Sequence, residues 1–310
     1  MSNNTNKARR VKATDLPFWG SGAVNDMNGQ IKSTDHVYST WSANVKRCFS
    51  MIWIVENRPS YILADMSADM KVLSNYHSFY KQNYREGYVL DKDILLDDNK
   101  YYSFQTCVFV PEYVNIAFVS SFKSSGLPIG VKAGKNNTFT STITIDGVTT
   151  SQTGFTTADE AHADWQLKKT QYLLDIANRY EIETNANGSF NQGILDKINE
   201  KATDIANDIV NGWHTIEASV EGVRKKLGTN EYEAYITMQG AVHVIDTYDT
   251  PEEAHKVWQQ GIIYQLQAKL AWWKSVAPND TIVEDYINKV INRLTNDMNN
   301  NMISIEYYKV

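Results

Sequence analysis

The chain has 310 residues, with 30 lysines and arginines against 36 aspartates and glutamates, which gives a formal net charge of −6. Its 42% hydrophobic and 21% charged content is typical of folded globular proteins, and its length favours two or three domains. The negative total argues against a general polyanion binder, and no apolar run approaches the ~20 residues of a membrane-spanning helix. Two cysteines, Cys48 and Cys107, exclude a disulfide framework and are more typical of small buried side chains than of a zinc site.

Residues 1–35 are predicted to form a basic N-terminal arm. Residues 1–60 carry eight lysines and arginines against four acidic residues, and the densest group is Lys7, Arg9, Arg10 and Lys12. No apolar segment follows these cations, so the arm does not resemble a signal peptide, and we expect a reducing, cytoplasmic location. A nucleic-acid contact would be local and would involve this arm first. The alternative is a solvated charged tail.

Residues 36–125 contain a pattern that extends over about 85 residues. Its parts are Tyr38-Ser-Thr-Trp41, Lys46-Arg47-Cys48, Val89-Leu-Asp-Lys-Asp93, Asn99-Lys-Tyr-Tyr-Ser103, Thr106-Cys-Val-Phe-Val-Pro111 and Asn115. The pattern resembles phage-encoded HNH-like proteins of the homing-endonuclease type, also called His-Me finger proteins. The resemblance implies a ββα finger that holds one divalent cation, Mg²⁺ or another, and cleaves DNA.

The same resemblance implies a role for each residue of a candidate catalytic set. Asp91 falls on the metal-binding aspartate, Asn115 on the helix ligand, and Asn99 on the loop asparagine that supports the finger. Lys92 falls on the general-base histidine, but a lysine is normally a cation and accepts a proton poorly. Asp93 is a further candidate for ligation or weak base activity. This set implies either a modified nuclease chemistry or a chain that no longer cuts, and the alternative for the carboxylates is a solvated acidic loop.

Residues 139–165 and 232–258 are two copies of one segment, aligned without a gap at an offset of 93 residues. Such a duplication indicates two structural modules. In each copy an alternating strand leads through a turn, Asp146-Gly147 or Gln239-Gly240, into a second strand, and a Thr-x-x-Glu capping box then begins a helix. We expect Trp165 and Trp258, one turn inside these helices, to be buried against the strands in equivalent positions.

Each copy resembles the DNA-binding domain of plant ethylene-response factors, the Apetala type, in which a three-stranded sheet packed on one helix enters the major groove. The resemblance implies DNA contacts from cations near the sheets, namely Lys132 and Lys135 in the first copy and Arg224, Lys225 and Lys226 in the second. Lys46 and Arg47 complete the candidate DNA-binding set, together with the cations of the arm.

Both copies depart from the ethylene-response-factor pattern. The strands of the first copy are rich in Thr and Ser and lack Arg, and the second copy carries Glu231 and Glu233 where a DNA-facing sheet needs cations. The alternative is therefore a module kept for scaffolding or protein contacts. His162 and His255 occupy the same place in both copies, and we expect a structural polar contact there more than a metal or phosphate ligand.

The sequence predicts an α+β protein with a ββα-finger-like domain followed by two repeated hairpin-sheet-plus-helix modules with extra helices. We expect the arm at 1–35, a degenerate HNH-like domain at 36–125, a first repeat with a trailing helix at 128–212, and a second repeat with a trailing helix and a C-terminal strand at 220–310. The leading hypothesis is a phage-type DNA-binding protein with metal-dependent nicking or cleavage, in the cytoplasm of the infected bacterial host. The alternative is a catalytically inactive descendant that binds a host or phage protein in host takeover.

Overall fold

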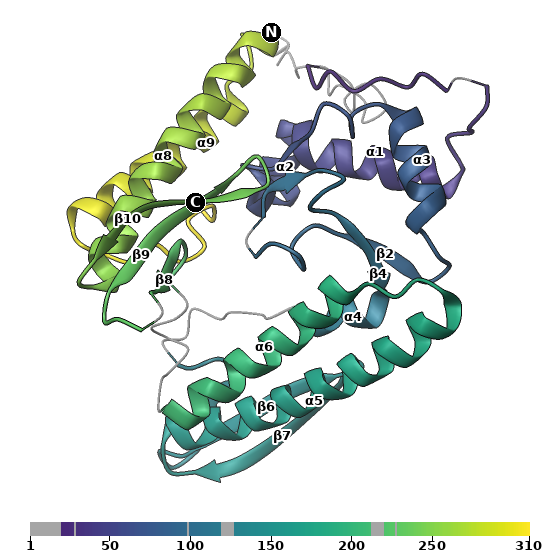
Figure 1. Ribbon diagram of the computed structural model, residues 1–310. Helices are drawn as coiled ribbons and strands as arrows, with labels where there is room; N and C mark the ends of the chain where they lie inside the picture. Colours follow the sequence, from purple (N-terminus) through teal and green to yellow (C-terminus); the bar gives the residue numbers. More distant parts are fainter. Residues whose placement is uncertain (1–19, 28, 98, 119–126, 212–219, 227) are drawn as a thin grey trace, which may run out of the picture.

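The computed structural model describes residues 20–310 apart from positions 28, 98, 119–126, 212–219 and 227. The architecture is mixed α+β, which confirms the predicted class. The described strands form small separate sheets of two or three strands each, and one long helix packs against each of the two three-stranded sheets (Figure 1).

The N-terminal region consists of short helices and two two-stranded sheets. The helices are α1 (His36–Phe49), α2 (Met51–Asn57), the 3-10 helix η1 (Pro59–Tyr61), α3 (Leu73–Asn83) and α4 (Glu112–Phe118). Strand β1 (Asp65–Met66) pairs in parallel with β3 (Tyr101–Tyr102). Strand β2 (Tyr88–Asp91) pairs antiparallel with β4 (Val108–Pro111), and β4 runs directly into α4.

The two repeats have the same order of elements. The first contains β5 (Val131–Ala133), β6 (Phe139–Ile145), β7 (Val148–Phe155), α5 (Ala158–Asn187) and α6 (Gln192–Asn211). The second contains β8 (Val223–Lys225), β9 (Tyr232–Met238), β10 (Ala241–Tyr248), α8 (Pro251–Val276) and α9 (Ile282–Asn299). Each sheet is antiparallel with the middle strand of the three in its centre, and the second helix runs back along the first (Figure 1). The predicted repeated modules are therefore confirmed.

Local sequence signals explain both hairpins and both helix starts. The turn residues have positive φ, at 48° and 78° for Asp146-Gly147 and at 50° and 77° for Gln239-Gly240, as a type I′ turn requires. The Thr157 hydroxyl accepts the backbone N–H of Glu160, whose carboxylate accepts the N–H of Thr157 in return. In the second copy Thr250 accepts the N–H of Glu253, but the Glu253 carboxylate binds the threonine hydroxyl, so the predicted capping box is complete only in the first copy.

A glycine and a tryptophan form the joint between sheet and helix in each repeat. Trp165 and Trp258 are 7% and 4% exposed, which confirms the prediction that both are buried. Gly130 and Gly222, just before the first strands, have φ of 80° and 74°. A Cβ atom at these positions would lie 2.2 Å from the Trp165 ring and 1.6 Å from the Trp258 ring, so only glycine fits.

The repeated histidines complete the same joint. The Nδ1 atoms of His162 and His255 lie 2.7 and 3.0 Å from the backbone oxygens of Ile129 and Glu221. Each imidazole is stacked on the tryptophan three residues later, with ring centroids 5.5 and 4.9 Å apart. Both histidines thus have the structural polar contact that the sequence favours over a ligand role.

The buried clusters connect the N-terminal region with both repeats. Met51, Ile54 and Ile62 pack in one cluster with Trp258 and other side chains of α8 and α9. A second cluster joins Ile94 and the buried residues of β4 and α4 with α5 and α6. Figure 1 shows the same arrangement, with the N-terminal helices and strands lying against one repeat through α2 and against the other through α4. The hydrophobic cores therefore cross the boundaries at 125–128 and 212–220 that the sequence suggests.

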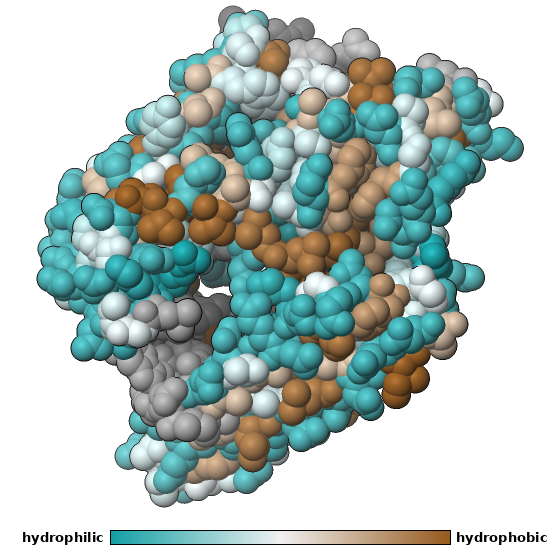
Figure 2. All heavy atoms as spheres, viewed as in Figure 1, coloured by the Kyte–Doolittle hydropathy of each residue, from teal (hydrophilic) through white to brown (hydrophobic). Residues whose placement is uncertain are grey.

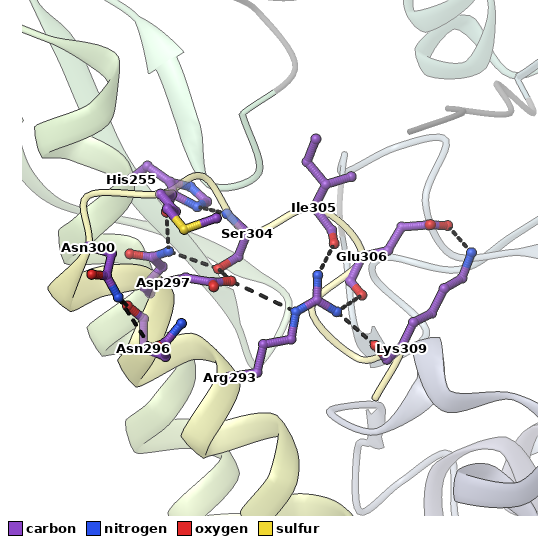
Figure 3. A network of polar contacts seen from close by, with 11 residues as sticks. His255, Arg293, Asn296, Asp297, Asn300, Ser304, Ile305, Glu306 and Lys309 are labelled. Atoms are coloured by element: carbon purple, nitrogen blue, oxygen red, sulfur yellow. Dashed lines mark hydrogen bonds and ion pairs between the residues drawn. The ribbon is translucent and has the colours of Figure 1, made fainter. Parts of the chain in front are cut away.

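The C-terminal segment does not form the predicted strand. Residues 302–310 have no strand pairing, and Glu306 has a φ of 46°. Their backbone groups bind side chains of the second repeat instead: the Ser304 N–H donates to His255 Nε2 at 2.9 Å, and the Arg293 guanidinium donates to the carbonyls of Ile305, Glu306 and Lys309 (Figure 3). The alternation Ile-Ser-Ile-Glu-Tyr-Tyr indicates a strand, but side chains of α8 and α9 satisfy the backbone without a partner strand.

None of the described helices combines the length and the apolar character that a bilayer crossing requires.

Candidate functional site

The HNH-like pattern surrounds the strand pair β2–β4 and the loop between these strands. Asp91, the last residue of β2, lies opposite Val108, the first residue of β4. Residues 92–107 form the loop and include β3, and α4 carries Asn115. The candidate catalytic residues therefore lie on a strand end, a loop and a helix that follow one another in space as well as in sequence.

Asp91 is engaged in shaping the loop. Its Oδ1 atom accepts the backbone N–H groups of Asp93 and Ile94, both at 2.7 Å, which is the geometry of an Asx turn. Burial raises the pKa of the Asp91 carboxyl and the neighbouring Asp93 charge adds to this, while the two N–H donors and Lys92 act against it. One carboxylate oxygen of Asp91 is therefore used by the backbone.

Lys92 and Asn99 close the loop. Lys92 is 8% exposed, and its Nζ atom donates to the Asp93 carboxylate and to the backbone oxygen of Asn99, both at 2.5 Å. Asn99 is fully buried; its Nδ2 atom donates to the backbone oxygens of Lys92 and Tyr101, both at 2.8 Å, and its Oδ1 atom accepts the Tyr101 N–H. An ammonium group with these acceptors has no lone pair for a water proton, so Lys92 acts here as a structural donor.

Asn115 is half-buried on α4, next to the fully buried Val114. Within the described chain, no hydrogen bond joins Asn115 to Asp91, and no group of three or more His, Cys, Asp or Glu side chains is arranged to hold a metal ion. One carboxylate oxygen of Asp91 and one amide are a small donor set for a divalent cation, and Lys92 adds a cation beside them. The residues present therefore fit the implied Mg²⁺ poorly, and the cation stays a prediction of the resemblance.

Cys48 and Cys107 are free, buried thiols of one hydrophobic cluster around Trp41. Burial raises the pKa of Cys48 far above the usual range of a thiol and that of Cys107 to about 12. Both side chains are therefore packed as small hydrophobic groups.

The candidate DNA-binding cations of the second repeat are paired with carboxylates. Arg224 Nε lies 2.8 Å from Glu233, and Lys226 Nζ lies 3.1 Å from Glu231. Strand β8 pairs with β9, so these ion pairs cross the sheet from strand to strand. Lys225, between the two, is half-buried. The acidic residues that the sequence places on this sheet thus neutralise its cations.

The first repeat offers a different surface. Lys132 on β5 and Lys135 in the following loop are exposed, and no ion pair of either is present among the described residues. On the neighbouring strands Thr142 lies opposite Ser151 and Thr144 opposite Thr149, with hydroxyl oxygens 3.2 and 2.8 Å apart. This sheet therefore presents hydroxyl groups flanked by two lysines and no carboxylate on its strands.

The remaining candidate cations divide into two groups. Lys46 packs over the ring of Trp53, 4.2 Å from its centroid, and Arg47 donates to Asn44 at 3.0 Å, so both are partly engaged on α1 and α2. The cations of the arm lie outside the described residues: Lys7, Arg9, Arg10 and Lys12.

Two lysines that bind backbone oxygens were not predicted from the sequence; Lys169 is buried and Lys269 is half-buried. Lys169 of α5 donates to the backbone oxygen of Ala117 in the last turn of α4 at 2.7 Å, and burial lowers its pKa to about 8. Lys269 of α8 donates to the backbone oxygens of Cys48 and Ala64 at 3.2 and 2.9 Å. Each long helix thus binds a helix end of the N-terminal region through one ammonium group, where the helix dipole favours a cation. The spacing of residues in the sequence does not predict these two contacts, because lysines are rarely found inside a protein.

No family model matches the chain, and neither a curated protein nor a solved structure is significantly similar to it.

Proposed function

We propose that the chain is a DNA-binding protein of the HNH homing-endonuclease lineage, in which the former catalytic loop has become a structural element. The hydrogen bonds of Lys92 are the observation that supports a structural role for this loop. Its ammonium group binds Asp93 and the backbone of Asn99, at the position where the resemblance requires a neutral base. The order of β2, β4 and α4 supports a ββα-finger origin for this region.

DNA binding is assigned to the first repeat together with the N-terminal arm. Lys132 and Lys135 stand beside a sheet whose strands carry hydroxyl groups and no carboxylate, whereas Arg224 and Lys226 are neutralised within their own sheet. Phosphate contacts from lysine and hydroxyl groups position a protein on DNA without reading its sequence. The location that accompanies this proposal is the cytoplasm of an infected bacterial cell.

The test measures binding of a random DNA duplex by fluorescence anisotropy across a series of salt concentrations. Each phosphate contact contributes about −0.9 to the slope of log K against log salt. The double variant Lys132→Gln/Lys135→Gln should flatten the slope by about two, and deletion of residues 1–12 by about 3.6, because four cations leave with them. The matched double variant Arg224→Gln/Lys226→Gln should leave the slope unchanged. No binding at low salt, or an equal effect of both double variants, would contradict the assignment.

Cleavage is tested separately, with a nicking assay on supercoiled DNA in Mg²⁺ and in Mn²⁺. We expect no nicking by the natural chain, since Lys92 leaves the attacking water without a base. Nicking that disappears in Asp91→Ala, with DNA binding retained, would restore the nuclease hypothesis and overturn the structural interpretation of the loop.

A second candidate function is protein binding through the second repeat. Met238, Val244 and Ile245 are 36%, 46% and 40% exposed on β9 and β10, and Figure 2 shows hydrophobic side chains gathered over these strands. Exposed apolar groups beside internally paired charges are typical of a protein-contact surface. Loss of a partner from pull-downs by Val244→Lys, with DNA binding unchanged, would support a host or phage protein as that partner.

A further inference from the structure

A cleft lies where the second repeat meets the N-terminal region. Its volume is about 480 Å³, which is in the range of small-molecule sites. The walls come from the end of α1, from β1 and β3, from the tip of the β9–β10 hairpin and from α8. Lys100 and Tyr101 of the loop between β2 and β4 line this cleft, but none of the candidate catalytic or DNA-binding residues does, so the inference does not rest on the proposed function.

The charge of the cleft is opposite to that of the chain. Lys71, Lys100 and Lys269 line it, and Asp65 is the one carboxylate among its described lining residues. Three cationic side chains and one carboxylate thus line the cleft, on a chain whose net charge is −6. A cleft lined mainly by charges of one sign attracts ligands of the opposite sign, and low-dielectric walls strengthen that attraction.

Two of these ammonium groups, those of Lys71 and Lys269, lie near the same aromatic ring. Lys71 Nζ lies 4.6 Å and Lys269 Nζ 5.5 Å from the centroid of Phe49, and Lys269 is also 4.9 Å from the centroid of Trp272. Burial lowers the pKa of Lys269, and the charge of Lys71 acts in the same direction, whereas Asp65 and Cys48 oppose it. The two backbone oxygens and the rings hold the Lys269 ammonium but do not neutralise it, so a bound anion would relieve the repulsion between the two lysines.

The mouth of the cleft carries aromatic rings. Tyr264 of α8 is 70% exposed, an unusual exposure for so large a side chain, and Tyr101 of β3 also lines the cleft. An exposed ring beside a group of cations is the arrangement that binds a base by stacking and its phosphate by charge. A plain inorganic anion would use the lysines alone and would leave Tyr264 without a role.

We propose that this cleft binds a nucleotide, with the phosphate at Lys71, Lys100 and Lys269 and the base on Tyr264. Two ligands offer this combination of base and phosphate: a free 5′-mononucleotide, and one nucleotide of a DNA single strand. Lys71 and Tyr264 are the residues to substitute, because both are accessible to solvent. Lys269 is less suitable, because its bonds to Cys48 and Ala64 are needed for packing.

Calorimetric titration of the full chain with AMP, adenosine and inorganic phosphate tests the proposal. AMP should bind at least tenfold more tightly than either fragment, because each fragment keeps only half of the contacts. Lys71→Gln should weaken AMP at least tenfold by removing a charge-assisted contact, and Tyr264→Ala about fivefold or more by removing stacking. Lys81→Gln on α3, outside the cleft, is the matched control and should bind like the natural chain.

A thermal melt of each variant verifies that it is folded, and Tyr264→Ala provides a second measurement should Lys71→Gln unfold. Equal affinities for AMP and adenosine, or natural AMP affinity in both variants, would overturn the proposal. If a single-stranded oligonucleotide displaces AMP, and both variants bind this oligonucleotide more weakly than the natural chain does, the ligand is a DNA strand. Tight AMP binding without such displacement identifies the free nucleotide.

Discussion

The two repeats share their inner joint and differ in almost everything outside it. In both repeats a glycine leaves room for a tryptophan ring, and a threonine side chain caps the start of the long helix. In both, a histidine ring also binds a backbone oxygen just before the first strand. Outside, the first sheet exposes hydroxyl groups, whereas the second exposes apolar side chains and internal ion pairs. The first hairpin turn has open space around Gly147, while a Cβ at Gly240 would lie 3.0 Å from Thr106 of the N-terminal region. Duplication thus preserved the packing that folds the module and left its surface to diverge.

The lysines that bind the N-terminal region, Lys169 and Lys269, show the same divergence. At the offset of 93 residues Lys169 aligns with Ile262, and Lys269 aligns with Ile176. The repeats therefore bind the N-terminal region through different positions on their long helices.

The largest expected effect concerns the shared joint. Gly222→Ala and Gly130→Ala should each lower the free energy of unfolding by about 3 kcal/mol or more, because the methyl group overlaps a tryptophan and the backbone has positive φ. Urea denaturation followed by fluorescence measures this. The matched control is Gly147→Ala, which has a φ of 78° and open space around it and should cost only about 1 to 2 kcal/mol. Equal losses at all three glycines would break the claim that the joint is common and tightly packed.

The pH dependence of stability tests the contact that Lys169 of the first repeat makes with α4. In the range from about 8, the pKa of Lys169 in the folded chain, to 10.5, its ordinary value, the unfolded chain binds a proton that the folded chain has released. The free energy of unfolding should therefore rise with pH across this window, by roughly 1 to 3 kcal/mol. The rise should be absent in Lys169→Met, measured as the difference from the natural chain so that tyrosine titration cancels. Lys168→Met, whose lysine is half-exposed and pairs with Asp164, should keep the rise.

The smallest effect concerns the C-terminal segment, which only the second repeat binds through His255. Burial lowers the pKa of His255 below 6.5, so in acid the unfolded chain takes up a proton before the folded chain does. The free energy of unfolding should then fall as pH drops below 6.5, by about 1 kcal/mol, because protonated Nε2 no longer accepts the Ser304 N–H. His255→Gln should remove this dependence, and His243→Gln, on the exposed edge strand β10, should not.

Short-range signals predicted the repeats well. The turn dipeptides, the capping threonines and the tryptophans are determined within about 35 residues of one another, so the sequence alone predicts hairpin, helix start and buried ring. The C-terminal segment is different, because its backbone partners on α8 and α9 include His255, 49 residues away. A pattern of alternating residues indicates a strand, but it carries no information on which distant side chains bind the backbone.

The loop between β2 and β4 combines contacts that the motif grouped with contacts that it did not. The motif placed Asp91, Lys92 and Asn99 near one strand end, and Asn99 is fully buried and binds the backbone of Lys92 and Tyr101. The roles that the resemblance implies for these residues stay predictions. The bonding of Lys92 to the Asn99 backbone was not predictable, since a lysine next to aspartates is as well explained by a solvated face. The cleft lined by Lys71, Lys100 and Lys269 was not predicted either, because its lysines come from α8 and from two separate segments of the N-terminal region.

The bonds of Lys269 also determine when the protein can finish folding during its synthesis. Lys269 follows Cys48 by 221 residues, and Lys169 follows Ala117 by only 52. At a translation rate of 5–20 residues per second, the ribosome needs roughly 3 to 10 s to extend the chain from Ala117 to Lys169. It needs roughly 11 to 44 s to extend the chain from Cys48 to Lys269. During that interval Met51, Ile54 and Ile62 have left the ribosome without the helices that cover them. The nascent chain thus displays the apolar surface of α2 and η1 until α8 and α9 have been made, and this surface is where a chaperone would bind it.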